Sequence, residues 1–235
     1  MTQYNFNSIG VIHSCYKEKF GIPRQPSLVE CPASIEMESD YSKDEAFREL
    51  ESFSHIWVVF VFHGIKNENW KLTVRPPRLG GNKRVGVFAS RSMFRPNPIG
   101  LSVVELKSVE RINNKIILNI IGGDFLDATP VIDIKPYIPY ADSINNGKSG
   151  YAVEEPKIKL QVDFSDSAVL EIESAESKHP KFKLIITQIL QLDPRPAYQS
   201  DKRIKDEFAI KLYDYDLKWK VEGDLVMVTS LTLIE

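Results

Sequence analysis

The sequence predicts a β-rich α+β fold with two parts, an N-terminal domain built as a barrel or a sandwich and a smaller α+β C-terminal domain. Three observations support this prediction. Six short runs of β-branched and aromatic residues, bounded by Gly, Pro and Asn, fall within the first 134 residues. A turn-rich stretch follows them. Two runs with helical periodicity and three further strand-like runs then complete the chain.

The N-terminal strands are expected where apolar residues cluster between turn residues. We expect them at Phe6–His13, His55–Phe62, Lys83–Ala89, Leu101–Val109, Ile116–Ile121 and Val131–Ile134. One helix is expected among them, because Ser42–Glu45 fits a capping box and Ala46, Leu50 and Phe53 follow at helical spacing.

The chain is expected to divide after residue 142. Asn145, Gly147 and Gly150 predict turns in the stretch that Pro156 closes. The expected parts are a first domain at residues 1–142, a linker at 143–156 and a second domain at 157–235. In the second domain we expect two helices, at Ser165–Ser177 and Lys181–Leu192, and three strands, at Phe208–Tyr215, Trp219–Glu222 and Leu225–Leu233.

Composition argues against several classes of protein. The 235 residues carry a formal net charge of −2, and 43% of them are hydrophobic, which is enough for a packed core. The N-terminus does not resemble a signal peptide, and no apolar run approaches membrane-spanning length. Cys15 and Cys31 make no disulfide framework, and neither has a His at zinc-ligand spacing. We therefore expect a cytoplasmic protein without a metal.

Positive charge is concentrated in one segment, Lys71–Ser102, which contains seven Lys or Arg and no Asp or Glu, and which we call the acid-free segment. Arg outnumbers Lys there by five to two, and Arg binds phosphate and carboxylate through paired hydrogen bonds. Gly80, Gly81, Pro96 and Pro98 predict loops that approach a ligand closely and hold one shape. The segment therefore indicates an anion site, with a solvated basic hairpin as the alternative.

Common catalytic motifs are absent from the sequence, including GxGxxG after a first strand, GxxxxGK[ST], GxSxG and HExxH. Six other segments occur in order: IGVIHSCYKEKFGIPRQP from Ile9, LESFSHIWVVFVFH from Leu50, RPPRLGG from Arg75, FRPNPIGLS from Phe94, GGDFLDATPVIDIKPY from Gly122 and DPRPAY from Asp193. Together they resemble the TsaA/TrmO-type tRNA methyltransferases. The resemblance covers the first 140 residues almost continuously and reaches the second domain through DPRPAY.

The resemblance implies a TsaA-like fold, a small β-barrel domain that binds S-adenosylmethionine (SAM) without a Rossmann sheet. It implies methylation of the exocyclic N6 of threonylcarbamoyl-modified adenosine, which stands beside the anticodon, at position 37, in threonine tRNAs. The partner would be the anticodon stem-loop of these tRNAs. The resemblance further implies a homodimer, with no metal and no membrane association.

Residues that match the family's SAM contacts come from five segments: Pro23, Arg24 and Gln25; His63 and Gly64; Arg91; Leu101; and Asp124, Phe125, Leu126 and Asp127. Chemically, an Arg can hold the carboxylate of SAM, and an Asp can favour its cationic sulfonium. Each also has a structural interpretation. His63 can simply cap a strand, and Asp124 and Asp127 can be turn residues.

The remaining basic residues are left for RNA: Arg75, Arg78, Lys83, Arg84 and Arg95. In DPRPAY, Asp193 is a candidate proton acceptor, Arg195 an anion clamp, and Tyr198 a hydrogen-bonding or stacking group. This loop can alternatively serve only to dock one domain on the other.

Two other functions remain open. One is an RNA-binding module without chemistry, which leaves the acidic residues Asp124 and Asp127 unexplained, because carboxylates repel phosphate. The other is a SAM-dependent methyltransferase that acts on a small molecule.

Overall fold

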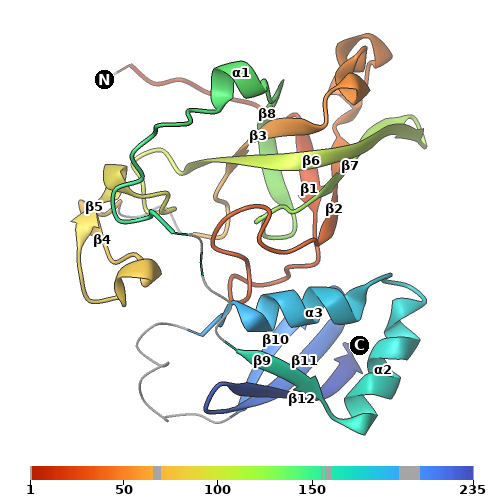
Figure 1. The fold of residues 1–235 in the computed structure, drawn as a ribbon. Helices are drawn as coiled ribbons and strands as arrows, with labels where there is room; N and C mark the ends of the chain where they lie inside the picture. The colour runs from red at the N-terminus through yellow and green to blue at the C-terminus, as the bar shows by residue number, and fades with distance from the viewer. Residues whose placement is uncertain (1, 66–69, 155, 157–159, 196–206, 235) are drawn as a thin grey trace.

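Six antiparallel strands close into a barrel in the N-terminal half of the chain (Figure 1), and their order around it is β1-β2-β7-β6-β3-β8. The computed structural model describes residues 2–65, 70–154, 156, 160–195 and 207–234. The barrel strands are β1 (Gly10–His13), β2 (Pro32–Met37), β3 (His55–Val61), β6 (Ile99–Ile112), β7 (Lys115–Ile121) and β8 (Thr129–Pro136). The β-rich α+β prediction is confirmed, and of its two N-terminal alternatives the chain forms the barrel.

Alternation along the strands fills the barrel interior. In β3 the side chains of Ile56, Val58 and Phe60 are buried, and the residues between them are only partly covered. These three join a core cluster to which every other barrel strand also contributes. Because successive side chains point to opposite faces, one β-branched run supplies both the packed interior and the outer wall.

The C-terminal region has a four-stranded sheet in the order β10-β11-β12-β9, and β12 and β9 run parallel. Two helices pack against it. The elements are β9 (Gln161–Phe164), α2 (Asp166–Glu176), α3 (Phe182–Gln191), β10 (Glu207–Leu212), β11 (Tyr215–Glu222) and β12 (Leu225–Leu233). In Figure 1, α3 lies on the side of this sheet that faces the barrel.

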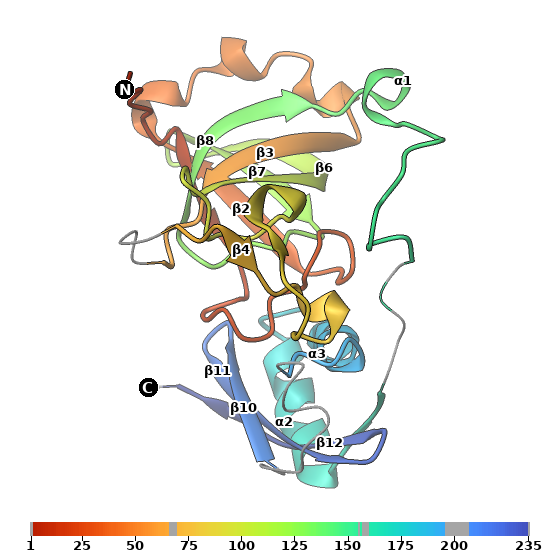
Figure 2. The same cartoon turned by 90° about the vertical axis from the view of Figure 1, so that its left-hand side faces the viewer.

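A small hairpin stands outside the barrel, as Figures 1 and 2 both show. It consists of β4 (Thr73–Val74) and β5 (Val85–Gly86), and a short helix, α1 (Pro139–Asp142), follows β8. The strand predicted at Lys83–Ala89 is therefore wrong over most of its length: only β5 pairs, and a 3₁₀ turn follows at Val87–Ala89.

The helix predicted after Ser42 is also wrong. The chain forms separate 3₁₀ turns there, at Asp44–Phe47 and Leu50–Ser52, and Glu49 between them has a left-handed φ of 66°. The hydroxyl of Ser42 caps no helix: it donates to the carbonyls of Met37 and Glu38 and accepts the amide proton of Ile116. The polar residue that looked like a helix start therefore fastens this segment to the barrel.

Other differences concern the edges of strands. Strands β2, β4 and β9 and helix α1 were not predicted, and the first strand begins at Gly10 instead of Phe6. The strand predicted through Tyr215 ends at Leu212, because Tyr213 has a left-handed φ of 52° and begins a turn into β11.

The two regions are joined through the β1–β2 loop, residues 14–31, which lies between the barrel and the C-terminal sheet in both views. Cys15, Tyr16, Val29 and Cys31 at its two ends are buried in the C-terminal core. The backbone amide of Tyr213 donates to the carbonyl of Cys15 at 2.8 Å, and Tyr16 forms an isolated antiparallel bridge with Leu212. The loop therefore starts and ends in the barrel but packs as part of the second region.

Gly21 allows the closest contact in this loop. Its φ is +95°, and a Cβ on it would lie 1.8 Å from Cδ1 of Ile210. We predict that Gly21→Ala destabilises the protein by about 3 kcal/mol, through a strained backbone and an overpacked contact. Thermal unfolding and urea unfolding measure this loss.

Gly223→Ala is the matched control. Gly223 also has a positive φ, of +61°, but a Cβ on it meets nothing within 4 Å. Gly223→Ala should lower the free energy of unfolding by only about 1 kcal/mol, because it strains the backbone but overpacks no contact. Equal losses for the two variants would show that the contact with Ile210 does not matter.

Candidate functional site

Three of the predicted cofactor residues meet at one end of the barrel. Nη1 of Arg91 donates to Oε1 of Gln25 at 2.7 Å, and Arg91 lies close enough to act electrostatically on Asp124. Oδ1 of Asp124 accepts a hydrogen bond from the hydroxyl of Ser102 at 2.7 Å. The structure thus brings together the β1–β2 loop, the acid-free segment, the start of β6 and the loop after β7.

Leu101 and the His63–Gly64 pair border this group. Leu101 precedes Ser102 in β6, and its side chain is 52% exposed. A Cβ on Gly64 would lie 2.9 Å from both Cδ2 of Leu126 and Cε of Lys19. Only glycine therefore fits here without displacing a neighbour, and the predicted segments 63–64 and 124–127 touch.

Thr129 orients the ring of His63. The threonine hydroxyl donates to the carbonyl of Leu126 at 2.6 Å and lies 3.3 Å from Nδ1 of His63. The two side chains are therefore within hydrogen-bonding distance of each other.

The two aspartates of the 124–127 segment differ in their electrostatics. Burial raises the pKa of Asp124, and the hydrogen bond from Ser102 and the charge of Arg91 only partly offset this effect. Burial also acts to raise the pKa of Asp127, but the ammonium of Lys17 at 2.6 Å and the amide of Ser14 at 2.9 Å bring it below its ordinary value. Asp127 is therefore stabilised in its charged form and holds the β1–β2 loop, whereas burial disfavours the charged form of Asp124.

Phe125 is part of the barrel core. Its side chain is 1% exposed and meets the ring of Phe60 edge-on, with 5.0 Å between the ring centroids. Its carbonyl accepts the hydroxyl proton of Ser14 at 2.8 Å. The side chain of Phe125 therefore belongs to the packed barrel interior against which the predicted site is built.

The described residues of the DPRPAY motif, Asp193–Arg195, follow the end of α3, and Asp193 acts electrostatically on Arg24 of the β1–β2 loop. Asp193 is 5% exposed, and its carboxylate accepts from Nε of Arg195 at 2.7 Å and from Nη2 at 3.1 Å. Partial burial lowers the pKa of Arg24, the charge of Asp193 opposes this change, and the positive charge of Arg78 adds to it. Arg24 therefore lies within electrostatic range of both domains. Tyr198 lies outside the described residues.

The residues predicted to bind RNA are spread along the β4–β5 hairpin and the chain that follows. Arg75, Lys83 and Arg84 are exposed and form no ion pair with a carboxylate among the described residues. Arg78 donates to the backbone carbonyl of Glu154 in the linker. Nη1 of Arg95 donates to two backbone carbonyls, which reduces its availability for phosphate.

Several residues that position this site were not predicted. Ser14, Lys17, Ser102 and Thr129 each bind a predicted residue or its backbone. One signal was available in the sequence, because Ser102 occupies an inward position of β6 between Gly100 and Val104, where a polar residue needs a hydrogen-bond partner. The bonds of Ser14 and Lys17 join residues more than 100 positions apart, and no local pattern reveals them.

The described part of the chain contains no group of three or more His, Cys, Asp or Glu that could hold a metal ion. None of its helices has the length and apolar character that crossing a bilayer requires.

Two family models match the chain. The tRNA-methyltransferase O N-terminal domain matches residues 11–143, and the TrmO C-terminal domain matches residues 157–234. The chain belongs to the tRNA-methyltransferase O family. The resemblance to TsaA/TrmO-type enzymes is thereby confirmed.

Relatives of known name match nearly the whole chain. The tRNA (adenine(37)-N6)-methyltransferase of Escherichia coli is 44% identical over 222 residues, which cover 94% of each chain. A Pseudomonas aeruginosa protein, RcsF, whose name describes an S-adenosylmethionine-dependent methyltransferase, is 40% identical over 97% of each chain. The crystal structure of TrmO from P. aeruginosa superposes with a TM-score of 0.81 at 33% identity, covering 99% of this chain and 98% of that one.

The residues at this end of the barrel fit the SAM that the family uses. Arg24 and Arg91 make no ion pair with a carboxylate within the described ranges, so both guanidinium groups can take an anionic ligand group. Asp124 is a partly buried carboxylate, and no ammonium or guanidinium of the described residues hydrogen-bonds to it, so a cationic ligand group would stabilise it. Leu101, next to Ser102 in β6, supplies an exposed apolar surface.

Replacing Asp124 tests its electrostatic character. A raised folded-state pKa means that folding disfavours the ionised form, so stability is lost as the pH rises through that pKa. We predict that Asp124→Asn, which keeps an acceptor for Ser102, stabilises the protein at pH 7 by about 1 kcal/mol, or about 2–4 °C in Tm. The gain should vanish near pH 3.

Asp127→Asn is the matched control with the opposite sign. The pKa of Asp127 is lowered, so its stabilising effect is present above the unfolded-state pKa and is lost as the pH falls through the folded-state pKa. This variant should therefore be less stable at pH 7. Thermal unfolding between pH 3 and pH 8 measures both effects, and a loss of stability in Asp124→Asn at pH 7 would contradict this account.

Proposed function

We propose that the protein transfers a methyl group from SAM to the exocyclic N6 of threonylcarbamoyl-modified adenosine at position 37 of threonine tRNAs. The observation that carries this proposal is the cluster of Gln25, Arg91, Asp124 and Ser102, formed in a chain that matches the tRNA-methyltransferase O family over both domains. The 44% identity to a tRNA (adenine(37)-N6)-methyltransferase supports the reaction.

SAM, when bound, supplies the electrophilic methyl group. Arg24 or Arg91 would hold its carboxylate, and Asp124 would favour the positive charge that SAM carries. Leu101 would cover apolar atoms of the cofactor, and the exposed ring of His63 would meet a polar group. The protein's task is alignment, because the N6 lone pair is delocalised and attacks only from a well-oriented position.

We propose that the anticodon stem-loop lies across the acid-free segment, with Arg75, Lys83 and Arg84 near its phosphates. These side chains are exposed, and no carboxylate competes for them among the described residues. Bases of an anticodon loop can be splayed out of the stack at little cost, which brings position 37 to the cofactor. The threonyl carboxylate of the modified base would meet one of the free guanidinium groups.

We propose that Asp193 receives the proton that N6 loses. Its carboxylate lies at the end of α3 and is held in one orientation by Arg195. Its position within electrostatic range of Arg24, a candidate cofactor residue, supports this proposal. We further propose that the enzyme acts in the cytoplasm and that it is a homodimer. Sedimentation equilibrium tests the homodimer, because it measures the mass of the particle in solution.

The choice of substrate is tested with two preparations of threonine tRNA, one carrying the threonylcarbamoyl group and one lacking it. We predict that methyl transfer from radiolabelled SAM is at least about 10-fold faster to the modified tRNA, because the site contains cationic groups that the unmodified base leaves unpaired. Equal transfer to both preparations would reject the modified base as substrate. Transfer to small molecules alone would favour the small-molecule methyltransferase, and no transfer and no SAM binding would favour a module that only binds RNA.

Asp193→Asn tests the proton acceptor. We predict a fall in kcat of about 100-fold, with the Kd for SAM unchanged, because a positioned base contributes about 10²–10⁴-fold. Asp216→Asn is the control: this carboxylate lies in β11 beside Lys218, away from the cluster, and its variant should turn over normally. Full activity of Asp193→Asn would remove Asp193 as the proton acceptor.

A further inference from the structure

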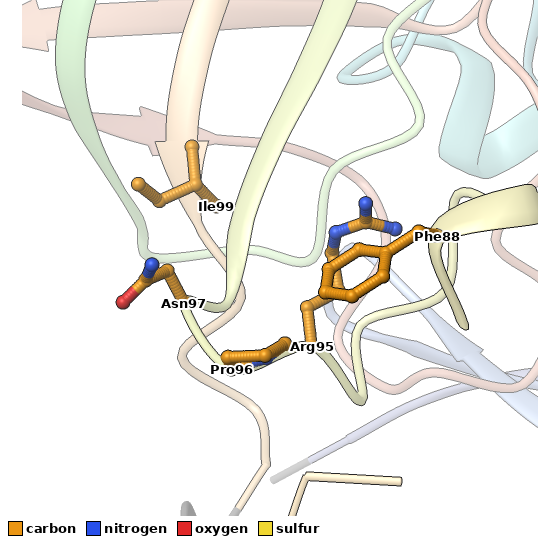
Figure 3. A pocket seen from close by; sticks show the side chains of 5 residues that line it. All are labelled: Phe88, Arg95, Pro96, Asn97 and Ile99. Atoms are coloured by element: carbon orange, nitrogen blue, oxygen red, sulfur yellow. The ribbon is translucent and has the colours of Figure 1, made fainter. Parts of the chain in front are cut away.

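A pocket of about 280 Å³ opens on the surface beside the candidate cofactor site, lined by Phe88, Arg95, Pro96, Asn97 and Ile99 (Figure 3). Figure 3 shows Phe88 and Arg95 on one side, Asn97 and Ile99 on the other, and Pro96 at the base. We propose that this pocket holds an unstacked nucleobase of the tRNA, with the base lying on the ring of Phe88. The inference rests on the proposed tRNA methyltransferase function.

Phe88 presents an aromatic face without a protein partner over most of its surface. It is the middle residue of the 3₁₀ turn Val87–Ala89, and its side chain is 72% exposed. The guanidinium carbon of Arg95 lies 5.7 Å from the ring centroid. A base that slides onto the ring would therefore be held by stacking and by an adjacent cation.

The walls of the pocket are held in place before a ligand enters. Nη1 of Arg95 donates to the carbonyl of Ser90 at 2.6 Å and to the carbonyl of Val87 at 3.2 Å. Pro96 and Pro98 on either side of Asn97 restrict the backbone there. A preformed slot loses little conformational entropy when it binds a flat ligand.

The surrounding charge selects the kind of ligand. The pocket lies within the acid-free segment, and the exposed cations Arg75, Lys83 and Arg84 belong to the same segment. A polyanion is attracted to such a surface, and each base of RNA arrives attached to a phosphate. The exposed amide of Asn97 offers both a donor and an acceptor, which suits the edge of a base. These features favour RNA over an apolar partner.

The pocket neighbours the candidate cofactor residues along the chain and along β6. Ile99 and Leu101 alternate with buried Gly100 in β6 and therefore point to the same outer face, about 7 Å apart along the strand. Ser90, whose carbonyl holds Arg95, directly precedes Arg91. A base in the pocket therefore lies beside the cofactor residues, so Phe88 would position the RNA for methyl transfer.

Phe88→Ala tests the proposal in the full-length protein. Removal of base stacking should raise the KM for tRNA by about 5- to 150-fold, which corresponds to about 1–3 kcal/mol, and leave the Kd for SAM unchanged. Phe88→Trp should keep the KM close to that of the wild type, because it restores an aromatic face. The control is Tyr140→Ala, which removes an aromatic side chain that is 90% exposed on α1, outside the pocket.

The outcomes distinguish the two flat groups that could occupy the pocket, a base of the tRNA and the adenine of SAM. The proposal is supported if Phe88→Ala raises the KM for tRNA and leaves the SAM affinity unchanged, while Phe88→Trp and Tyr140→Ala keep a KM close to that of the wild type. Weaker SAM binding would assign the pocket to the adenine of the cofactor and overturn the proposal, and an unchanged KM would also overturn it. Methyl transfer by the wild-type protein in the same assay tests the proposed function separately.

Discussion

The structure depends on one constraint, which is that the β1–β2 loop belongs to both domains at once. Its ends continue barrel strands, but Cys15, Tyr16, Val29 and Cys31 are buried in the C-terminal core. The amide of Glu30 bonds the side-chain oxygen of Gln188 at 2.8 Å, and Glu18 accepts the amide of Lys211 at 2.9 Å. Because Pro23–Gln25 lie in this loop, the second domain sets the position of the candidate cofactor residues.

The same constraint gives the charged residues two different tasks. The ion pair of Asp127 with Lys17 fixes the β1–β2 loop, and the ion pair of Asp193 with Arg195 holds the proposed proton acceptor in one orientation. Asp124 and the guanidinium groups of Arg24 and Arg91 form no such ion pair among the described residues. Paired charges thus hold groups in place, and the charges without such a pair are the ones proposed to bind the charged groups of SAM.

Sequence reasoning identified most barrel strands, because alternation over a closed sheet leaves a clear local signal. It failed at Ser42, where a capping-box pattern serves a long-range bond to Ile116, and at β2, whose pattern is mixed. For the candidate site, the ordered motifs predicted Gln25, Arg91 and Asp124, which the structure brings together. The supporting bonds from Ser14, Lys17 and Thr129 connect distant segments and became visible only in the fold.

Native-state hydrogen exchange tests the dependence of the β1–β2 loop on the second domain most directly. Amides of one cooperative unit open with the same free energy. The amide of Glu30 in the loop and the amide of Tyr213, which bonds the carbonyl of Cys15, should open together with the interior amides of β10–β12. Opening of Glu30 at a much lower free energy than the C-terminal sheet would show that the loop moves independently and would contradict this account.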